Sequence, residues 1–174
     1  MRFPNYYRGT CYGLQINTGA AVSDFFEWRL NGIDWGMALH YLEVQAVATA
    51  AALRLIGLFK RSTEPSGGGT TGGNHGIMPL RSNMLALPAA IVRNGYLVSP
   101  TTPGTLVDEI AVRRIVLGAT GTGVEPPPVV FNFREKPQYL DADDQSLVLN
   151  AFGITGDAGN AFNLNYEISI FRIN

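Results

Sequence analysis

The chain has 174 residues, enough for one domain with a substantial core, and a net charge of −1. With no basic excess to drive phosphate binding, nucleic acid is not expected as a primary partner. Cys11 is the only cysteine, which excludes an internal disulfide and a cysteine-based zinc site within one chain. Charged residues make up 16% of the chain, against roughly 25% in typical soluble domains.

The basic residues are mostly arginine: of thirteen, only Lys60 and Lys136 are lysine. Lysine is depleted from protein interfaces and arginine is enriched there. We interpret the low charge and the arginine bias as signs of a subunit largely covered by neighbours. The alternative is a Gly/Ala-rich or thermally stable monomer.

Two features bear on membranes and location. The first residues, MRFPNYYRGT, lack the apolar core of a secretory signal. The most apolar run, Ala46–Phe59, is too short to span a bilayer and contains Arg54. We therefore expect a protein made in the cytoplasm, without a membrane or nucleic acid as partner.

Residues 1–40 are rich in aromatic side chains and read as an irregular N-terminal arm with a first strand near Tyr12–Ile16. Asn31-Gly32 predicts a hairpin turn. Two interpretations of this segment stay open: the aromatic residues pack on their own core, or the arm docks on a neighbouring molecule.

The middle of the chain predicts strands over Tyr41–Val47, Leu53–Arg61, Met78–Leu87 and Ile110–Leu117. A helix over residues 46–59 remains an alternative. Residues 62–76, STEPSGGGTTGGNHG, predict an exposed glycine-rich loop. Asn94-Gly95 predicts a turn within residues 91–98, and loops are expected at residues 99–105 and 118–128.

The C-terminal third shows the clearest period-two pattern. Val129, Phe131 and Phe133 alternate with polar residues, a short apolar strand follows at residues 147–150, and residues 164–170 alternate again. Eight to ten short strands separated by turn residues predict an all-β fold, a single antiparallel β-sandwich or jelly roll. We expect residues 1–40 as the arm and residues 41–174 as the jelly-roll domain.

Motifs for catalysis or cofactors are weak. Gly67, Gly69 and Gly72 match G-x-G-x-x-G, but no helix can begin after them. Asp141, Asp143 and Asp144 resemble the start of a calcium loop that lacks its later glycine and glutamate, so a solvated turn is favoured.

The same holds for metal ligands and nucleophiles. The only histidines, His40 and His75, have no histidine or cysteine at ligand spacing, and no G-x-S-x-G occurs. We expect no metal, no cofactor and no enzymatic activity, with a jelly-roll isomerase as the enzymatic alternative.

Several segments resemble a group of tailed-bacteriophage virion proteins. They are LRLIGLFKRSTEPSGGG at residues 53–69, Met78-Pro79-Leu80, VVFNFREKPQYLDADDQSLVLNA at residues 129–151 and NLNYEISIF at residues 163–171. The group typically closes soon after an aromatic-acidic pair; here Tyr166-Glu167 is internal and FRIN extends beyond it.

This resemblance covers roughly residues 41–174. It implies a jelly roll similar to tumour-necrosis-factor-like modules, a homotrimer, and a place in the virion bound to the major capsid protein or other virion proteins. The implied function is capsid decoration, stabilising the outer capsid surface.

The residues expected to contact partners come from the arm and from the glycine-rich loop. They are Phe3, Tyr6, Tyr7, Arg8, Gly67, Gly68, Gly69 and His75. The alternative function is a receptor- or glycan-binding head of a tail fibre or spike, with Trp28 and Trp35 as a sugar platform.

Overall fold

The computed structural model describes residues 5–15, 22–48, 52–67, 70–71, 74–80, 86–98, 100–119, 126–152 and 161–173. These residues form strands and no helix, so none of them forms a helix that crosses a membrane. The strands are β1 (Asn5–Gln15), β2 (Val22–Leu30), β3 (Trp35–Ala48), β4 (Ala52–Arg61), β5 (Thr70–Thr71), β6 (Asn74–Pro79), β7 (Ile91–Val98), β8 (Leu106–Ala119), β9 (Val129–Asn132), β10 (Gln138–Leu140), β11 (Ser146–Phe152) and β12 (Ala161–Arg172).

The chain is folded back on itself so that its first strands pair with its last. β1 pairs with β12, β2 with β11, β3 with β9 and β10, and β4 with β8, all antiparallel. This doubled hairpin is wound into two sheets, which is the jelly-roll arrangement. The all-β sandwich expected from the sequence is confirmed.

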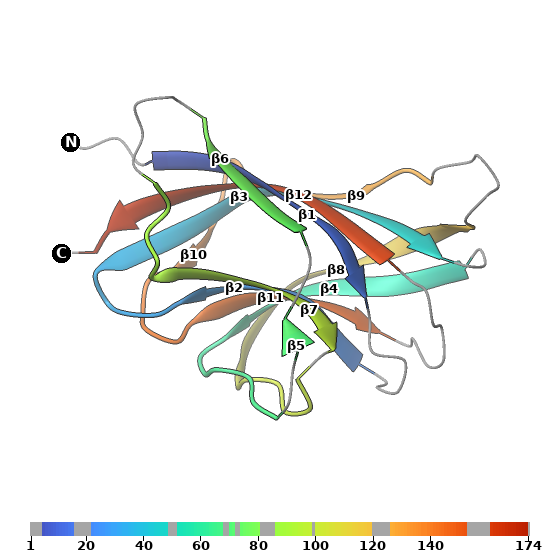
Figure 1. Ribbon diagram of the computed structural model, residues 1–174, viewed down its shortest axis with the longest axis horizontal. Helices are drawn as coiled ribbons and strands as arrows, with labels where there is room; N and C mark the ends of the chain where they lie inside the picture. Colours follow the sequence, from blue (N-terminus) through green and yellow to red (C-terminus); the bar gives the residue numbers. More distant parts are fainter. Residues whose placement is uncertain are drawn as a thin grey trace.

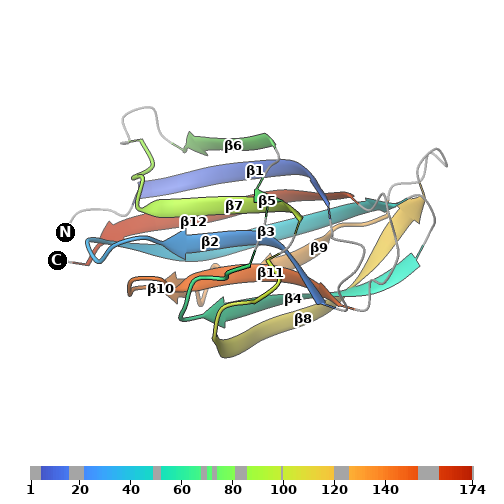
Figure 2. The ribbon, with the colours of Figure 1, turned by 60° about the horizontal axis from the view of Figure 1, so that its bottom comes forward.

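Sheet A has the order β6-β1-β12-β3, with β9 and β10 on the far side of β3, and sheet B has the order β7-β2-β11-β4-β8. The sheets pack face to face (Figures 1 and 2). They are joined where Gly118 and Ala119 of β8 run parallel to Val47 and Ala48 of β3. β5 adds to the edge of sheet B beside β7.

The core lies between the two inner faces and is aromatic at its centre. Phe25 of β2 stacks on Phe162 of β12 with ring centroids 4.5 Å apart, and Trp28 meets Tyr166 edge to face at 5.1 Å. All four side chains are fully buried. Aromatic pairs of this kind add roughly 0.5–1.5 kcal/mol beyond the area they bury.

Residues 5–15 and 22–40, the described part of the first forty, are not an irregular arm but contain β1, β2 and the start of β3, so this expectation was wrong. β1 lies between β12 and β6, and β2 lies between β11 and β7. One side of each strand faces the core, and a register shift that leaves Phe25 out of the ladder with β11 allows the adjacent Phe25 and Phe26 both to be buried. Four aromatic residues of β1 and β2 pack on the protein's own core, as the first of the two interpretations proposed. They are Tyr7, Phe25, Phe26 and Trp28.

Three local predictions also need correction. Asn31-Gly32 does form a turn, with Gly32 at φ 119°, but the turn carries the chain from sheet B to sheet A and the strands beside it do not pair. Asn94-Gly95 lies inside β7, opposite Glu27 and Phe26 of β2. The helix considered for residues 46–59 is replaced by the end of β3 and by β4.

The predicted loop at residues 62–76 is shorter than expected, because β5 and the start of β6 fall within it. Its first part is anchored: Ser66 and Thr102 exchange backbone hydrogen bonds, and Thr101 N donates to Gly67 O at 3.1 Å. Figure 1 shows residues 62–67 and β5 below sheet B, on the side away from sheet A.

The outer face of sheet B carries buried polar groups. Arg61 of β4 donates through Nη1 and Nη2 to the two carboxylate oxygens of Asp24 on β2, and Asn150 of β11 donates to Asp24 Oδ1 at 2.7 Å. Nearby, Tyr96 donates to Glu27 Oε2 at 2.6 Å. These are structural contacts, since the side chains are almost fully covered.

Candidate functional site

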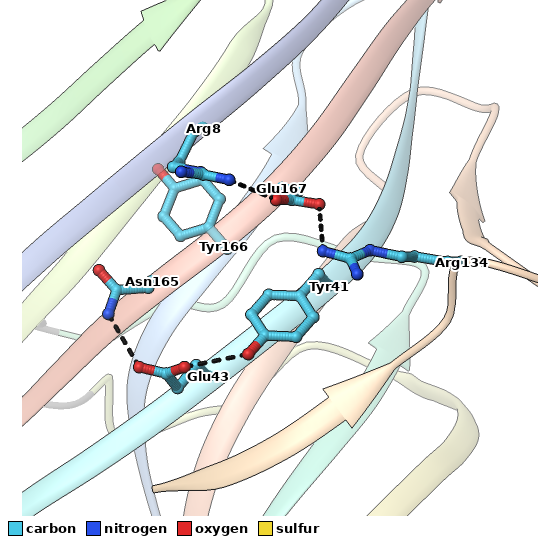
Figure 3. Close-up of a pocket in the computed structure, with 7 residues that line it drawn as sticks. All are labelled: Arg8, Tyr41, Glu43, Arg134, Asn165, Tyr166 and Glu167. Carbon is cyan, nitrogen blue, oxygen red and sulfur yellow. Dashed lines mark hydrogen bonds and ion pairs between the residues drawn. The ribbon is translucent and has the colours of Figure 1, made fainter. Parts of the chain in front are cut away.

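The outer face of sheet A holds a hollow of about 320 Å³ that gathers polar side chains from several segments (Figure 3). It is formed by β1, β12, β3 and the segment between β9 and β10. The lining residues are Arg8, Tyr41, Glu43, Arg134, Asn165, Tyr166 and Glu167. Strand alternation places them: Leu164, Tyr166 and Ile168 are buried toward the core, so Asn165 and Glu167 point outward.

Glu167 is the centre of the charges in this hollow. Arg8 Nη2 donates to Glu167 Oε1 at 2.8 Å, and Arg134 Nη2 donates to Oε2 at 3.0 Å. The two arginines reach the carboxylate from β1 and from the segment after β9, one on each oxygen (Figure 3). Both arginine side chains remain more than half exposed, at 59% and 57%.

Tyr41 and Glu43 form the second half of the hollow. The guanidinium of Arg134 lies 5.0 Å from the centroid of the Tyr41 ring, a cation–π contact. The Tyr41 hydroxyl donates to Glu43 Oε2 at 3.0 Å, and Asn165 Nδ2 donates to Glu43 Oε1 at 3.1 Å. Each carboxylate is thus held by two donors.

The ionisation of these groups follows from the contacts. Burial by itself raises the pKa of Glu167, but the hydrogen bonds and charges of Arg8 and Arg134 outweigh it, and the net pKa lies below the ordinary glutamate value. Burial and the hydrogen bond to Glu43 raise the pKa of Tyr41. At neutral pH Glu167 is therefore ionised and Tyr41 is protonated.

His40 and Ser169 lie beside the hollow and resemble a hydrolase pair. His40 Nε2 is 2.7 Å from Ser169 Oγ, and the Tyr6 ring lies 5.3 Å from the imidazole. Ser169 is 3% exposed, whereas a nucleophile must be reachable by its substrate. Burial lowers the pKa of His40. The pair ties β3 to β12.

The expected contact residues are distributed unevenly. Tyr6 is 38% exposed and Arg8 is exposed on the outer face of sheet A, but Tyr7 is 1% exposed and belongs to the core, so its prediction was wrong. Adjacent strand residues face opposite sides, and no choice of register exposes all three. Phe3 lies outside the described residues.

The structure describes only part of the glycine-rich loop. Gly67 is exposed, with φ 85°, and accepts a 2.9 Å hydrogen bond from the Thr101 hydroxyl. Gly68 and Gly69 lie outside the described residues. The backbone of His75 belongs to β6, where it pairs with Cys11.

The sugar platform proposed from the tryptophans was wrong. Trp28 is fully buried in the core. Trp35 is half-buried, and the guanidinium of Arg172 stands 4.9 Å above its ring.

Residues 141–144 form a turn that is stabilised by the Asp143 carboxylate. The backbone N–H groups of Gly32 and Asp144 donate to Asp143 Oδ1 at 2.6 and 3.1 Å, which joins this turn to the β2–β3 turn. In the part of the chain that the structure describes, no three His, Cys, Asp or Glu side chains gather as metal ligands would.

Sequence reasoning missed the residues that line the hollow, apart from Arg8. Asn165 and Glu167 were recognised as the polar half of an alternating strand, which is the available signal. Tyr41 and Glu43 join them only through the pairing of β12 with β3, where Asn165 lies opposite Glu43. Arg134 joins them through the pairing of β9 with β3, where Asn132 lies opposite Tyr41.

Comparisons with known proteins add little. No family model and no curated protein matches this chain. A solved structure described as infectious bursal disease virus Gx strain aligns with 11% identity and a TM-score of 0.17, over 98% of this chain and 42% of that one. The chain thus spans less than half the length of that viral chain, and a TM-score this low supports no conclusion.

Proposed function

We propose that this chain is a non-enzymatic structural protein of a bacteriophage virion, a capsid decoration protein that stabilises the outer capsid surface as a homotrimer. The resemblance of its sequence to that group motivates the proposal, and the jelly-roll fold is compatible with it. Because jelly rolls also serve as enzymes and lectins, fold alone does not decide among these functions. The outer face of sheet A carries the side chains that favour a binding role.

One observation supports a binding role over a catalytic one: Glu167 is locked between Arg8 and Arg134. A general acid or base works best when its pKa lies near the operating pH. The pKa of Glu167 is instead moved down, away from neutrality. The carboxylate fixes two exposed arginines in place, and preorganised arginine and tyrosine side chains are typical of protein interfaces.

The contact is expected to join this face to an acidic or hydrogen-bond-accepting surface on the capsid. The outward guanidinium edges of Arg8 and Arg134 supply donors in fixed geometry, and Tyr41 supplies aromatic surface beside them. A bound carboxylate or carbonyl would accept hydrogen bonds from the guanidinium N–H groups of Arg8 and Arg134 that do not donate to Glu167.

Co-sedimentation with purified capsids of the phage that encodes this chain tests the proposal. Wild-type protein should bind in many copies, and the pair of substitutions Arg8→Ala and Arg134→Ala should weaken binding at least about tenfold. Arg172→Ala, which removes an arginine stacked on Trp35 elsewhere, is the matched control and should bind normally. Absence of the chain from purified virions would refute the proposal.

A second candidate, a receptor- or glycan-binding head, is favoured by the shape of the hollow. Its volume of about 320 Å³ falls at the lower end of the range for small-ligand sites. Glu43 and Asn165 present planar polar groups beside the Tyr41 ring. A glycan array decides: binding lost in Asn165→Ala supports this candidate, and no binding by wild type refutes it.

A further inference from the structure

β8 is the edge strand of sheet B and leaves one side of its backbone unpaired over most of its length. It pairs with β4 from Leu106 to Leu117, and with β3 only at Gly118 and Ala119. Among the described residues no other strand pairs with it, and Figure 2 shows it as the last strand of its sheet. Such an edge presents free N–H and C=O groups that can accept another strand.

Ile115 of β8 is buried in the core, but seven of its described side chains are exposed, and three of these are large and apolar. Leu106, Val107 and Val116 are 58%, 56% and 48% exposed. Proline and lysine, which commonly protect an edge strand, are absent from β8. Two register shifts displace Val107 and Ile110 from the ladder with β4, but the run from Ala111 to Leu117 is regular.

The charges along β8 are arranged so that the strand complements itself. Asp108 and Glu109 lie in its first half, and Arg113 and Arg114 lie in its second half. No described residue forms an ion pair with Glu109 or Arg114 within the chain. If a second β8 runs antiparallel beside the first, the acidic half of each faces the basic half of the other.

The ladder with β4 allows this pairing to be worked out face by face. Leu106, Glu109, Val112, Arg114 and Val116 stand opposite Arg61, Phe59, Gly57, Leu55 and Leu53 of β4, which are alternate positions and so share one face. Because Ile110 has no place in this ladder, Glu109 and Arg114 each lie two ladder positions from Val112. A twofold axis at Val112 therefore sets Glu109 of one copy opposite Arg114 of the other. The same axis sets Leu106 opposite Val116.

We propose that β8 pairs antiparallel with β8 of a second copy of this chain, so that sheet B continues across a twofold axis. Parallel pairing in register would set like charges side by side, which is destabilising. The contact is isologous, so it closes at two copies. On β4, Leu53 and Leu55 are exposed and lie opposite Val116 and Arg114 of β8. They extend the apolar surface beside the axis.

This contact is independent of the proposed virion role and uses a different surface from the hollow on sheet A. It also differs from the threefold contact of a trimer. If both contacts form, the assembly contains six copies. If only the β8 contact forms, it contains two.

Charge reversal tests the pairing. Light scattering and sedimentation of the full 18.8 kDa chain should give a dimer, or a hexamer if trimers also form. Glu109→Arg and Arg114→Glu, made singly, should each weaken the contact roughly ten- to a hundredfold, because each puts like charges opposite one another twice. The double variant E109R/R114E should recover it, since the pairs are merely exchanged.

Mixing the two single variants provides the sharpest result. The E109R copy offers only basic residues at these positions and the R114E copy only acidic ones, so together they should form a mixed dimer although neither self-associates. Glu135→Arg, the same change in an exposed loop, is the control and should leave the mass unchanged. Circular dichroism establishes that each variant is folded.

A wild-type monomer, or a trimer whose mass the variants do not alter, would overturn the proposal. So would a double variant that fails to recover association. None of these results bears on whether the chain binds capsids, which is measured separately through Arg8 and Arg134.

Discussion

The buried triad of Asp24, Arg61 and Asn150 provides the sharpest test of how this fold is held together. Asp24 and Arg61 have side chains only 4% and 6% exposed. Arg61 Nη2 donates to Asp24 Oδ1 at 2.9 Å, and Asn150 donates to the same oxygen at 2.7 Å. Asp24→Ala leaves a buried guanidinium without its carboxylate, which should cost about 3–5 kcal/mol of the free energy of unfolding.

That loss is a large share of a total stability of about 5–15 kcal/mol. Urea unfolding followed by tryptophan fluorescence measures it, at one fixed protein concentration because self-association would add to the apparent stability. The matched control is Asp141→Ala. Asp141 lies 4.0 Å from Lys60 and is 62% exposed, and Lys60 keeps its hydrogen bond to Tyr139 O, so the loss of Asp141 should cost less than about 1 kcal/mol.

The double variant D24L/R61M completes the comparison. Replacing both charged partners by apolar side chains removes the isolated charge, so most of the lost stability should return. If Asp24→Ala costs no more than Asp141→Ala, the reasoning from burial is refuted.

Three further outcomes are expected. Gly9→Ala should lower the free energy of unfolding by about 1–3 kcal/mol in chemical denaturation, because its Cβ would collide with the buried Tyr166 ring. Cys11 should resist a thiol reagent at pH 8 until urea unfolds the chain, because burial raises its pKa to about 11. Because the pKa of Glu167 is lowered in the folded state, its ion pairs stabilise the fold above the ordinary glutamate pKa of 4.5, and this contribution is lost as pH falls through the folded pKa. Melting temperatures at pH 6 and pH 3 should therefore differ less in the variant carrying Arg8→Ala and Arg134→Ala, by an amount corresponding to less than about 1 kcal/mol.

The strands that could be predicted are those with one buried face. β12 was found at residues 164–170 because its apolar residues strictly alternate, and the structure places it in the middle of sheet A. β10 was missed because three residues are too few to show a period and because Pro137 precedes them. β1 and β2 were underestimated because their aromatic residues were interpreted as an arm.

Turn residues were informative about local bends and misleading about topology. Asn31-Gly32 makes a turn, yet its flanking strands enter different sheets. Asn94-Gly95 makes no turn: Asn94 donates to Glu27 at 3.2 Å, and Gly95 lies opposite Phe26 inside β7. A glycine inside a strand cannot be distinguished in the sequence from a glycine in a turn.

The sequence by itself determined the fold class, because period-two alternation separates a core face from a solvent face wherever a strand is half-buried. It also contained the charge order of β8, whose meaning depends on that strand being an edge. Only the tertiary structure decided that β8 is an edge, that Tyr7 and Trp28 are core, and that Arg8, Arg134 and Glu167 meet. The physical reason is that these facts depend on which distant strands hydrogen-bond to one another, and local side-chain patterns do not encode that pairing.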